Sequence, residues 1–173
     1  TDTEQATGEA LNPAVTYGGV TYTADTAEYR LAKFDAELGD WFNETSTIFY
    51  YLFTELFLMT DSRAKNSFPT LYDNGVWCWL PYDMDTAIGI NNMGQLTFGY
   101  YLEDIDLVGG EPVYNGQNSV LWKNLRATRY EQIKAMYQQL RSDKLLTYED
   151  VVERFEDHQS KWPEAIFNED AYY

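Results

Sequence analysis

The chain has 173 residues, of which 45% are hydrophobic and 17% are aromatic, and a disordered protein does not carry so many aromatic residues. The formal net charge of −16 argues against binding to nucleic acid or to an anionic membrane, because their phosphates would be repelled. This charge is compatible with a basic protein substrate, with divalent metal ions, or with simple solubility. No apolar stretch reaches the roughly 18 residues that a membrane span needs.

Residues 1–26 are rich in Thr, Gly and Ala, and this composition predicts an irregular N-terminal segment. One short strand is expected within it, at Val20–Tyr22. The chain starts with Thr1 rather than Met, and we therefore expect it to be a piece of a longer protein. A single domain is expected over residues 27–173.

Two helices are predicted at the start of this domain. Apolar residues recur at spacings of three and four from Leu31 to Trp41, which indicates a helix that begins near Ala27. Asn43 is a suitable N-cap for a second helix over residues 44–60. Because this second helix is apolar on nearly every side, we expect it at the centre of the domain.

A β-hairpin is predicted after the second helix. Residues 70–72 and 76–80 are the expected strands, and the Asp-Asn-Gly sequence at 73–75 is a strong turn signal. A polar loop with two acidic residues follows at 82–89, and a weaker hairpin is expected over residues 96–102.

The last third of the chain is predicted to be helical. Asn118 or Ser119 can cap one helix, and the apolar pattern continues from Tyr130 to Leu140. A capping box at residues 147–150 begins a final helix. The residues of that helix that we expect to face inward are Val151, Val152 and Phe155. The expected fold class is therefore α+β, mostly helical, with a small β-hairpin inserted after the buried helix.

The polar residues around the hairpin carry the clearest functional signal. Asp61 lies where the buried helix is predicted to end, and Asn66 follows five residues later. Asp83 and Asp85 lie where the chain leaves the hairpin. This order of an Asp-x-x-x-x-Asn loop, two short strands and a metal-binding Asp is the order of the protein-kinase catalytic core.

Phosphoryl transfer explains why these residue types are needed. One carboxylate must meet the attacking hydroxyl, which is the role predicted for Asp61. Hard oxygen ligands must hold Mg²⁺, and we expect Asn66, Asp83 and Asp85 to supply them. Arg63 is predicted to lean toward the transferred phosphate. The spacing from Asp61 to Asn66 is uninformative by itself, and only the ordered set indicates a kinase.

The segment at 80–89, Leu-Pro-Tyr-Asp-Met-Asp-Thr-Ala-Ile-Gly, resembles the Pro-Trp-Asp-Leu-Asp-x-x-Phe-Gly pattern of the CotH-like (spore coat protein H) atypical protein kinases. Tyr82, Met84 and Ile88 stand where Trp, Leu and Phe are usual. The aromatic helix before the hairpin and the helices after it are also similar to that family, so the resemblance covers about residues 28–165. Thr60 precedes Asp61, where His or Tyr usually anchors the catalytic loop.

The resemblance implies a kinase-like C-terminal lobe that uses ATP with Mg²⁺ or Mn²⁺. It implies phosphorylation of Ser or Thr in a surface or coat protein, and an extracellular, spore-surface or phage-associated location. No Gly-rich phosphate loop and no strand Lys paired with a helix Glu is found in the sequence. We therefore expect the N-terminal lobe to lie outside this chain and the chain alone to be inactive.

Other readings of the sequence remain open. Five Trp and 15 Tyr could line a carbohydrate- or partner-binding face, and a degenerate kinase fold could act as a structural module. Asp83 and Asp85 resemble the start of an EF-hand loop, but Ile88 and Gly94 stand where Gly and Glu are required. A paired-carboxylate glycosidase and a triad based on His158 are less consistent with the pattern.

Overall fold

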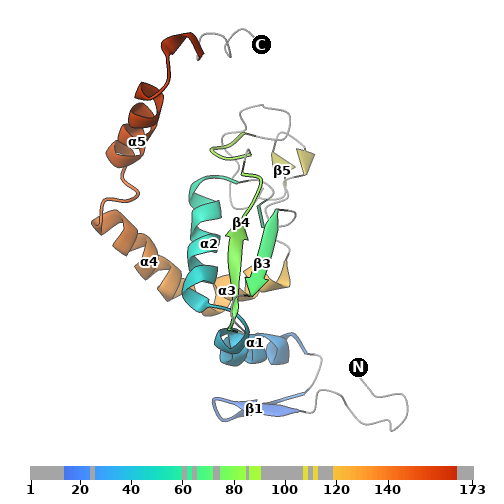
Figure 1. The fold of residues 1–173 in the computed structure, drawn as a ribbon. Coiled ribbons are helices and arrows are strands. Elements are labelled where there is room, and N and C mark those ends of the chain that lie inside the picture. The colour runs from blue at the N-terminus through green and yellow to red at the C-terminus, as the bar shows by residue number, and fades with distance from the viewer. Residues whose placement is uncertain are drawn as a thin grey trace. The chain divides into compact units, whose positions relative to one another are not determined.

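The computed structural model describes residues 14–23, 26–59, 62–63, 66–71, 75–84, 86–90, 107–108, 111–112 and 119–166. The named elements are β1 (Val15–Tyr17), β2 (Val20–Tyr22), α1 (Ala27–Trp41), α2 (Glu44–Leu56), β3 (Ser67–Leu71), β4 (Trp77–Pro81), β5 (Leu107–Val108), β6 (Glu111–Pro112), α3 (Val120–Thr128), α4 (Tyr130–Ser142) and α5 (Tyr148–Ser160) (Figure 1). The strands pair as three antiparallel two-stranded sheets within the described ranges. This confirms the predicted α+β, mostly helical fold class. The chain divides into two compact units. The first unit ends at Ile133, and the second begins at Lys134.

The described end of the N-terminal segment is a β-hairpin. The predicted strand β2 is present, and it pairs with β1, which the sequence analysis did not predict. Gly18 and Gly19 form the turn with φ of 56° and 79°, a left-handed conformation that glycine adopts without steric cost. The hydroxyl of Tyr17 donates to Oε1 of Glu37 at 2.9 Å and so ties the hairpin to α1.

Helices α1 and α2 begin at side-chain caps. The hydroxyl of Thr26 accepts from the backbone N–H of Tyr29 at 3.0 Å, and Oδ1 of Asn43 accepts from that of Ser46 at 2.8 Å. Each cap satisfies one of the N–H groups that a helix start leaves without an intrahelical partner. The predicted cap at Asn43 is thereby confirmed.

Helix α2 ends four residues earlier than the sequence suggested. Leu58 has a φ of 48°, and the backbone N–H of Met59 donates to the carbonyl of Thr54 at 3.0 Å. The N–H of Leu58 donates to Glu55 at 3.2 Å, which completes a Schellman motif. The sequence could not reveal this end, because glycine rather than leucine usually occupies the left-handed position.

The core of the first unit is built from aromatic side chains of α2, β4 and α3. We call Tyr50, Tyr51, Trp79 and Trp122 the aromatic cluster. The ring centroids of Trp79 and Trp122 are 4.9 Å apart, and the ring of Tyr50 stacks on each of them at 5.6 and 5.9 Å. Such pairs contribute about 0.5–1.5 kcal/mol each beyond the area that they bury. The core therefore lies between α2 and the hairpin, with α3 closing it.

Only one side of α2 is buried in this core. Ile48 and Leu52 are almost fully buried, whereas Phe49 and Leu56 are 46% and 38% exposed. The prediction that α2 lies at the centre is thus correct for its inner face and wrong for its outer face. The helix lies beside β4, and β3 is on the far side of β4 (Figure 1).

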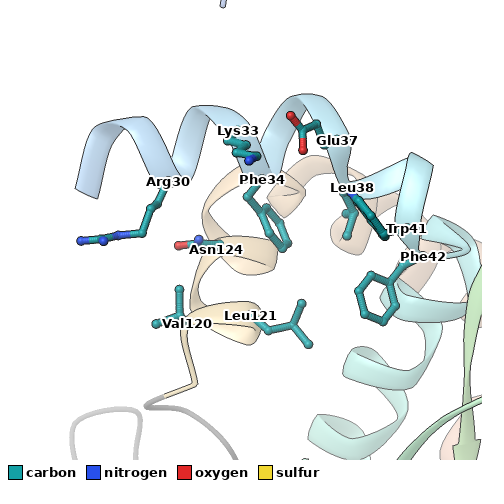
Figure 2. A pocket seen from close by; sticks show the side chains of 10 residues that line it. All are labelled: Arg30, Lys33, Phe34, Glu37, Leu38, Trp41, Phe42, Val120, Leu121 and Asn124. Atoms are coloured by element: carbon teal, nitrogen blue, oxygen red, sulfur yellow. The ribbon is translucent and has the colours of Figure 1, made fainter. Parts of the chain in front are cut away.

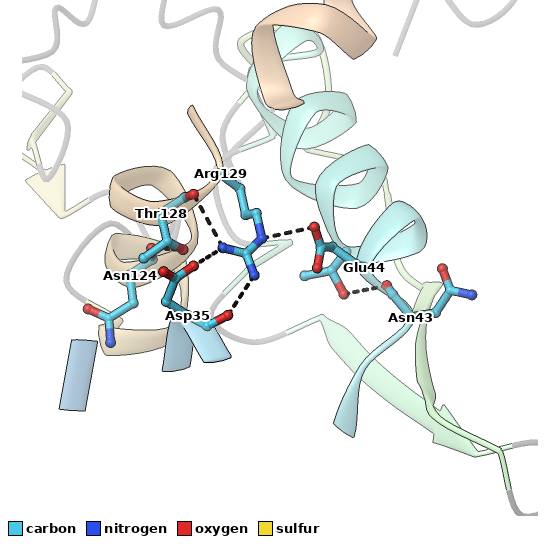
Figure 3. Close-up of polar contacts among 7 residues, drawn as sticks. Asp35, Asn43, Glu44, Asn124, Thr128 and Arg129 are labelled. Carbon is cyan, nitrogen blue, oxygen red and sulfur yellow. Dashed lines mark hydrogen bonds and ion pairs between the residues drawn. The ribbon is translucent and has the colours of Figure 1, made fainter. Parts of the chain in front are cut away.

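A buried arginine ties three helices of the first unit together (Figure 3). Nε of Arg129 donates to Oε1 of Glu44 at 2.9 Å, and Nη2 donates to the backbone oxygen of Asp35 at 2.9 Å. Nη1 is paired with the Asp35 carboxylate. Burial lowers the pKa of Arg129, but its hydrogen bonds to the carboxylates of Asp35 and Glu44 outweigh this effect, so the pKa is raised above its usual value. The guanidinium therefore stays charged and holds α1, α2 and the end of α3.

Helix α5 begins at the predicted cap Thr147, whose hydroxyl accepts from the backbone N–H of Asp150 at 3.2 Å, the first of the two bonds of a capping box. Neither α4 nor α5 contains a buried residue. Phe155 is 56% exposed, so the expectation that it faces inward is wrong. No helix in the described ranges has both the length and the apolar character to cross a membrane. The predicted hairpin at 96–102 lies outside the described residues.

Candidate functional site

The two loops predicted to carry the chemistry meet at one end of the β3–β4 hairpin. The register pairs Ser67 with Pro81, so the residue before β3 and the residues after β4 reach the same end. Nδ2 of Asn66 lies 3.3 Å from Oδ2 of Asp83 and 3.4 Å from its backbone oxygen, and it donates to both. Two residues that are 17 positions apart and share a predicted role are thus in contact.

Asn66 and Asp83 offer the kind of atoms that bind a hard cation. Carboxylate and amide oxygens are ligands that Mg²⁺ accepts, and Mg²⁺ needs few of them because it keeps several waters. Within the part of the chain that the structure describes, no three His, Cys, Asp or Glu residues form a metal-binding group. Asp61 and Asp85 lie outside that part, so their predicted catalytic and metal-binding roles stay predictions.

The loop after β4 is fixed against the C-terminal end of α2. The backbone N–H of Ile88 donates to the carbonyl of Phe57 at 2.6 Å, and Thr86 is buried. Asp83 and Ile88 have φ of 50° and 58°, in the left-handed region that costs most residues roughly 1–2 kcal/mol. Such conformations persist only where the surroundings fix them, and they concentrate at functional sites.

The loop between α2 and β3 is anchored by aromatic side chains of the core. The buried hydroxyl of Tyr50 donates to the carbonyl of Ser62 and, at 3.4 Å, to that of Asn66. Nε1 of Trp122 donates to the carbonyl of Arg63 at 3.1 Å. These bonds supply an anchorage that the sequence did not show, since Thr60 occupies the usual anchoring position. The one available signal was that a buried Tyr or Trp needs a partner for its polar atom.

Arg63 lies against α2. Its side chain is only 2% exposed, and Nη2 is 2.5 Å from Oε1 of Glu55. The guanidinium carbon is 4.9 Å from the ring centroid of Tyr51, a distance that allows a cation–π interaction. The sequence predicted instead that Arg63 leans toward a transferred phosphate. Sequence reasoning also missed Glu55 as its partner, because the two residues meet only after α2 has ended and the chain has turned back.

The family model for CotH, described as CotH kinase protein, matches residues 21–166. The chain belongs to the CotH kinase family. The match covers the helices of both units and the hairpin that carries Asp83, and it extends slightly beyond the 28–165 expected from the resemblance. No curated protein and no solved structure matches the chain.

Residues of α1 and α3 line a largely apolar groove of this CotH kinase domain (Figure 2). It has a volume of about 320 Å³ and lies between α1 and α3. Its lining residues are Arg30, Lys33, Phe34, Glu37, Leu38, Trp41, Phe42, Val120, Leu121 and Asn124. Phe42, in the lining, forms an isolated β-bridge with Trp77, the first residue of β4. Asp83 lies beyond the opposite end of that strand, two residues after Pro81. The groove therefore includes neither Asn66 nor Asp83.

Proposed function

We propose that this CotH kinase domain supplies the catalytic and metal-binding loops for transfer of the γ-phosphoryl group of ATP to a Ser or Thr hydroxyl of a protein. The observation that carries the proposal is the contact between Asn66 and Asp83 at one end of the hairpin. Family membership supports a kinase-like domain. The contact supports the finer assignment, because these two residues occupy the positions expected of the metal ligands.

The residues have distinct roles in the proposed reaction. Asp61 accepts the proton of the substrate hydroxyl while that oxygen bonds to the γ-phosphorus and the bond to the ADP oxygen breaks. Asn66, Asp83 and Asp85 would hold Mg²⁺ or Mn²⁺, which neutralises charge on the phosphate oxygens when bound. Tyr50 and Trp122 hold the backbone of the loop between α2 and β3 against the core through their hydrogen bonds to Ser62, Arg63 and Asn66.

The proposed substrate is a protein of a surface or coat, in keeping with the resemblance. A net charge of −16 favours basic segments around the acceptor, because opposite charges raise the local concentration of the substrate. The proposed arrangement is that this chain forms a C-terminal lobe and that the groups that grip the nucleotide lie elsewhere in the natural protein.

The test is transfer of labelled phosphate from ATP to a basic Ser-containing protein by the full-length natural protein, with Mg²⁺ or Mn²⁺. We expect transfer by the wild type, loss of at least 100-fold for Asp83→Asn, and no change for Asp40→Asn, which neutralises another exposed carboxylate, on α1. Metal-independent transfer, or equal transfer by both variants, would show that Asp83 holds no catalytic metal. Absence of transfer by the wild type would leave the degenerate-kinase reading, in which the fold serves as a structural or binding module.

A further inference from the structure

The ion pair between Glu55 and Arg63 joins the end of α2 to the candidate catalytic loop. The Arg63 side chain is 2% exposed and that of Glu55 is 31% exposed, so the pair is largely removed from solvent. Breaking a buried pair by removal of one partner is strongly unfavourable, whereas replacement of both partners by apolar groups is often neutral. Stability alone is therefore a weak reason for placing a charged pair here.

The guanidinium is not fully satisfied by this pair. Nε and Nη1 of Arg63 are buried, and neither has a hydrogen-bond partner among the residues that the structure describes. Leaving buried donors without acceptors costs free energy. Among the described residues, hydrogen bonding alone therefore does not account for the burial of this guanidinium.

The same residue is also held through its backbone. The carbonyl of Arg63 accepts from Nε1 of Trp122 at 3.1 Å, while its side chain is held by Glu55. Arg63 follows Asp61 by two residues and precedes Asn66 by three. Arg63 is therefore held both through its backbone and through its side chain.

We propose that Arg63 is a positioning residue, which acts through Glu55 to hold the loop 61–66 so that Asn66 meets Asp83. This deepens the proposed function and rests on it for its effect on turnover. A guanidinium that is buried against α2 and paired through Nη2 with Glu55 can contact a phosphate only if that pair breaks. The rate effect of Arg63 is therefore transmitted through the loop backbone, and Glu55 is as necessary as Arg63.

The first experiment does not depend on activity. The indole N–H of Trp122 reports on the loop, because it donates to Arg63, whereas that of Trp79 donates to the hydroxyl of Thr47 at 3.1 Å and reports on the core. Hydrogen exchange of both indoles is followed by ¹H–¹⁵N NMR in the full chain. In Glu55→Gln we expect exchange of the Trp122 indole to quicken at least 10-fold while that of Trp79 is unchanged.

A matched control is available on the same helix. Glu44→Gln removes the charge of another glutamate that pairs with a buried arginine, but that pair lies away from the loop. We expect it to leave the ratio of the Trp122 and Trp79 exchange rates unchanged. If Glu55→Gln leaves that ratio unchanged as well, whether neither indole or both are affected, the positioning role is wrong. Arg63→Lys, which keeps the charge, is expected to restore part of the protection that Arg63→Gln loses.

The second experiment measures turnover by the full-length natural protein. Glu55→Gln and Arg63→Gln are each expected to lower kcat by about 10–100-fold, the usual effect of losing a residue that orients a site. The KM for ATP should stay within twofold, and the double variant should be no slower than either single one. A large loss for Arg63→Gln with none for Glu55→Gln would place Arg63 on the phosphate and overturn the proposal. An inactive wild type would refute the proposed function, while the indole exchange would still decide whether Arg63 positions the loop.

Discussion

Replacement of Arg129 by Met removes the guanidinium that joins α1, α2 and the end of α3 while keeping a side chain of similar length. Arg129 makes two ion pairs, with Asp35 and Glu44. A hydrogen bond to a charged group contributes roughly 1.5–3 kcal/mol, so two of them would amount to about 3–6 kcal/mol. The carboxylates are 57% and 37% exposed and regain water when the partner is lost, which reduces this by about half. The expected loss in the free energy of unfolding is therefore about 1.5–3 kcal/mol.

This loss can be measured by urea denaturation followed by tryptophan fluorescence. Four of the five Trp residues belong to the unit that ends at Ile133, so the signal reports mainly on the unit that contains Arg129. With a slope of about 2 kcal/mol per molar urea, the midpoint should fall by about 0.8–1.5 M. Arg154→Met on α5, where the arginine is exposed, should shift it by less than about 0.3 M, since such surface changes rarely exceed about 0.5 kcal/mol. Equal midpoints for Arg129→Met and the wild type would refute the conclusion that Arg129 stabilises the contact between α1, α2 and the end of α3.

Two further changes test how the catalytic loop and α2 are held. Tyr50→Phe removes the hydroxyl that donates to the carbonyls of Ser62 and Asn66. It should cost about 1–2 kcal/mol in urea denaturation, because the contact with Ser62 is buried and this hydrogen bond is lost. An unchanged midpoint would mean that water replaces the hydroxyl. Asn43→Ala removes the cap of α2 and should cost about 1 kcal/mol, whereas Asn43→Ser should cost less than half of that because serine also caps. If both variants lose the same amount, the side-chain cap does not stabilise α2.

Local features of this fold could be predicted because they depend on neighbouring residues. The caps at Asn43 and Thr147 were identified because each lies directly before an apolar pattern of helical period. The hairpin was identified from its turn sequence, although β3 begins at Ser67 rather than at residue 70. The end of α2 could not be predicted in this way, because leucine rarely adopts the left-handed conformation that Leu58 has there.

Contacts over long sequence distances could not be predicted. Arg129 is 94 residues from Asp35 and 85 from Glu44, and no periodicity links them. Within the site, the order of parts was sufficient to suggest that Asn66 and Asp83 meet. The burial of Arg63 was not foreseen, because it depends on how the chain turns after α2 and on the ring of Tyr51 beneath the guanidinium. The motif therefore predicted that Asn66 and Asp83 meet, and only the structure showed how Ser62, Arg63 and Asn66 are held by Tyr50 and Trp122.

The most direct test of Asn66 and Asp83 as metal ligands is calorimetry of ATP binding to the full-length natural protein, with and without Mn²⁺. We expect that ATP binding requires the metal. The affinity for ATP should fall at least tenfold in Asp83→Asn and stay unchanged in Asp40→Asn. Binding that is equally tight in Asp83→Asn, or that does not need the metal, would contradict the assignment of Asp83 and Asn66 as the metal-binding pair of this CotH kinase domain.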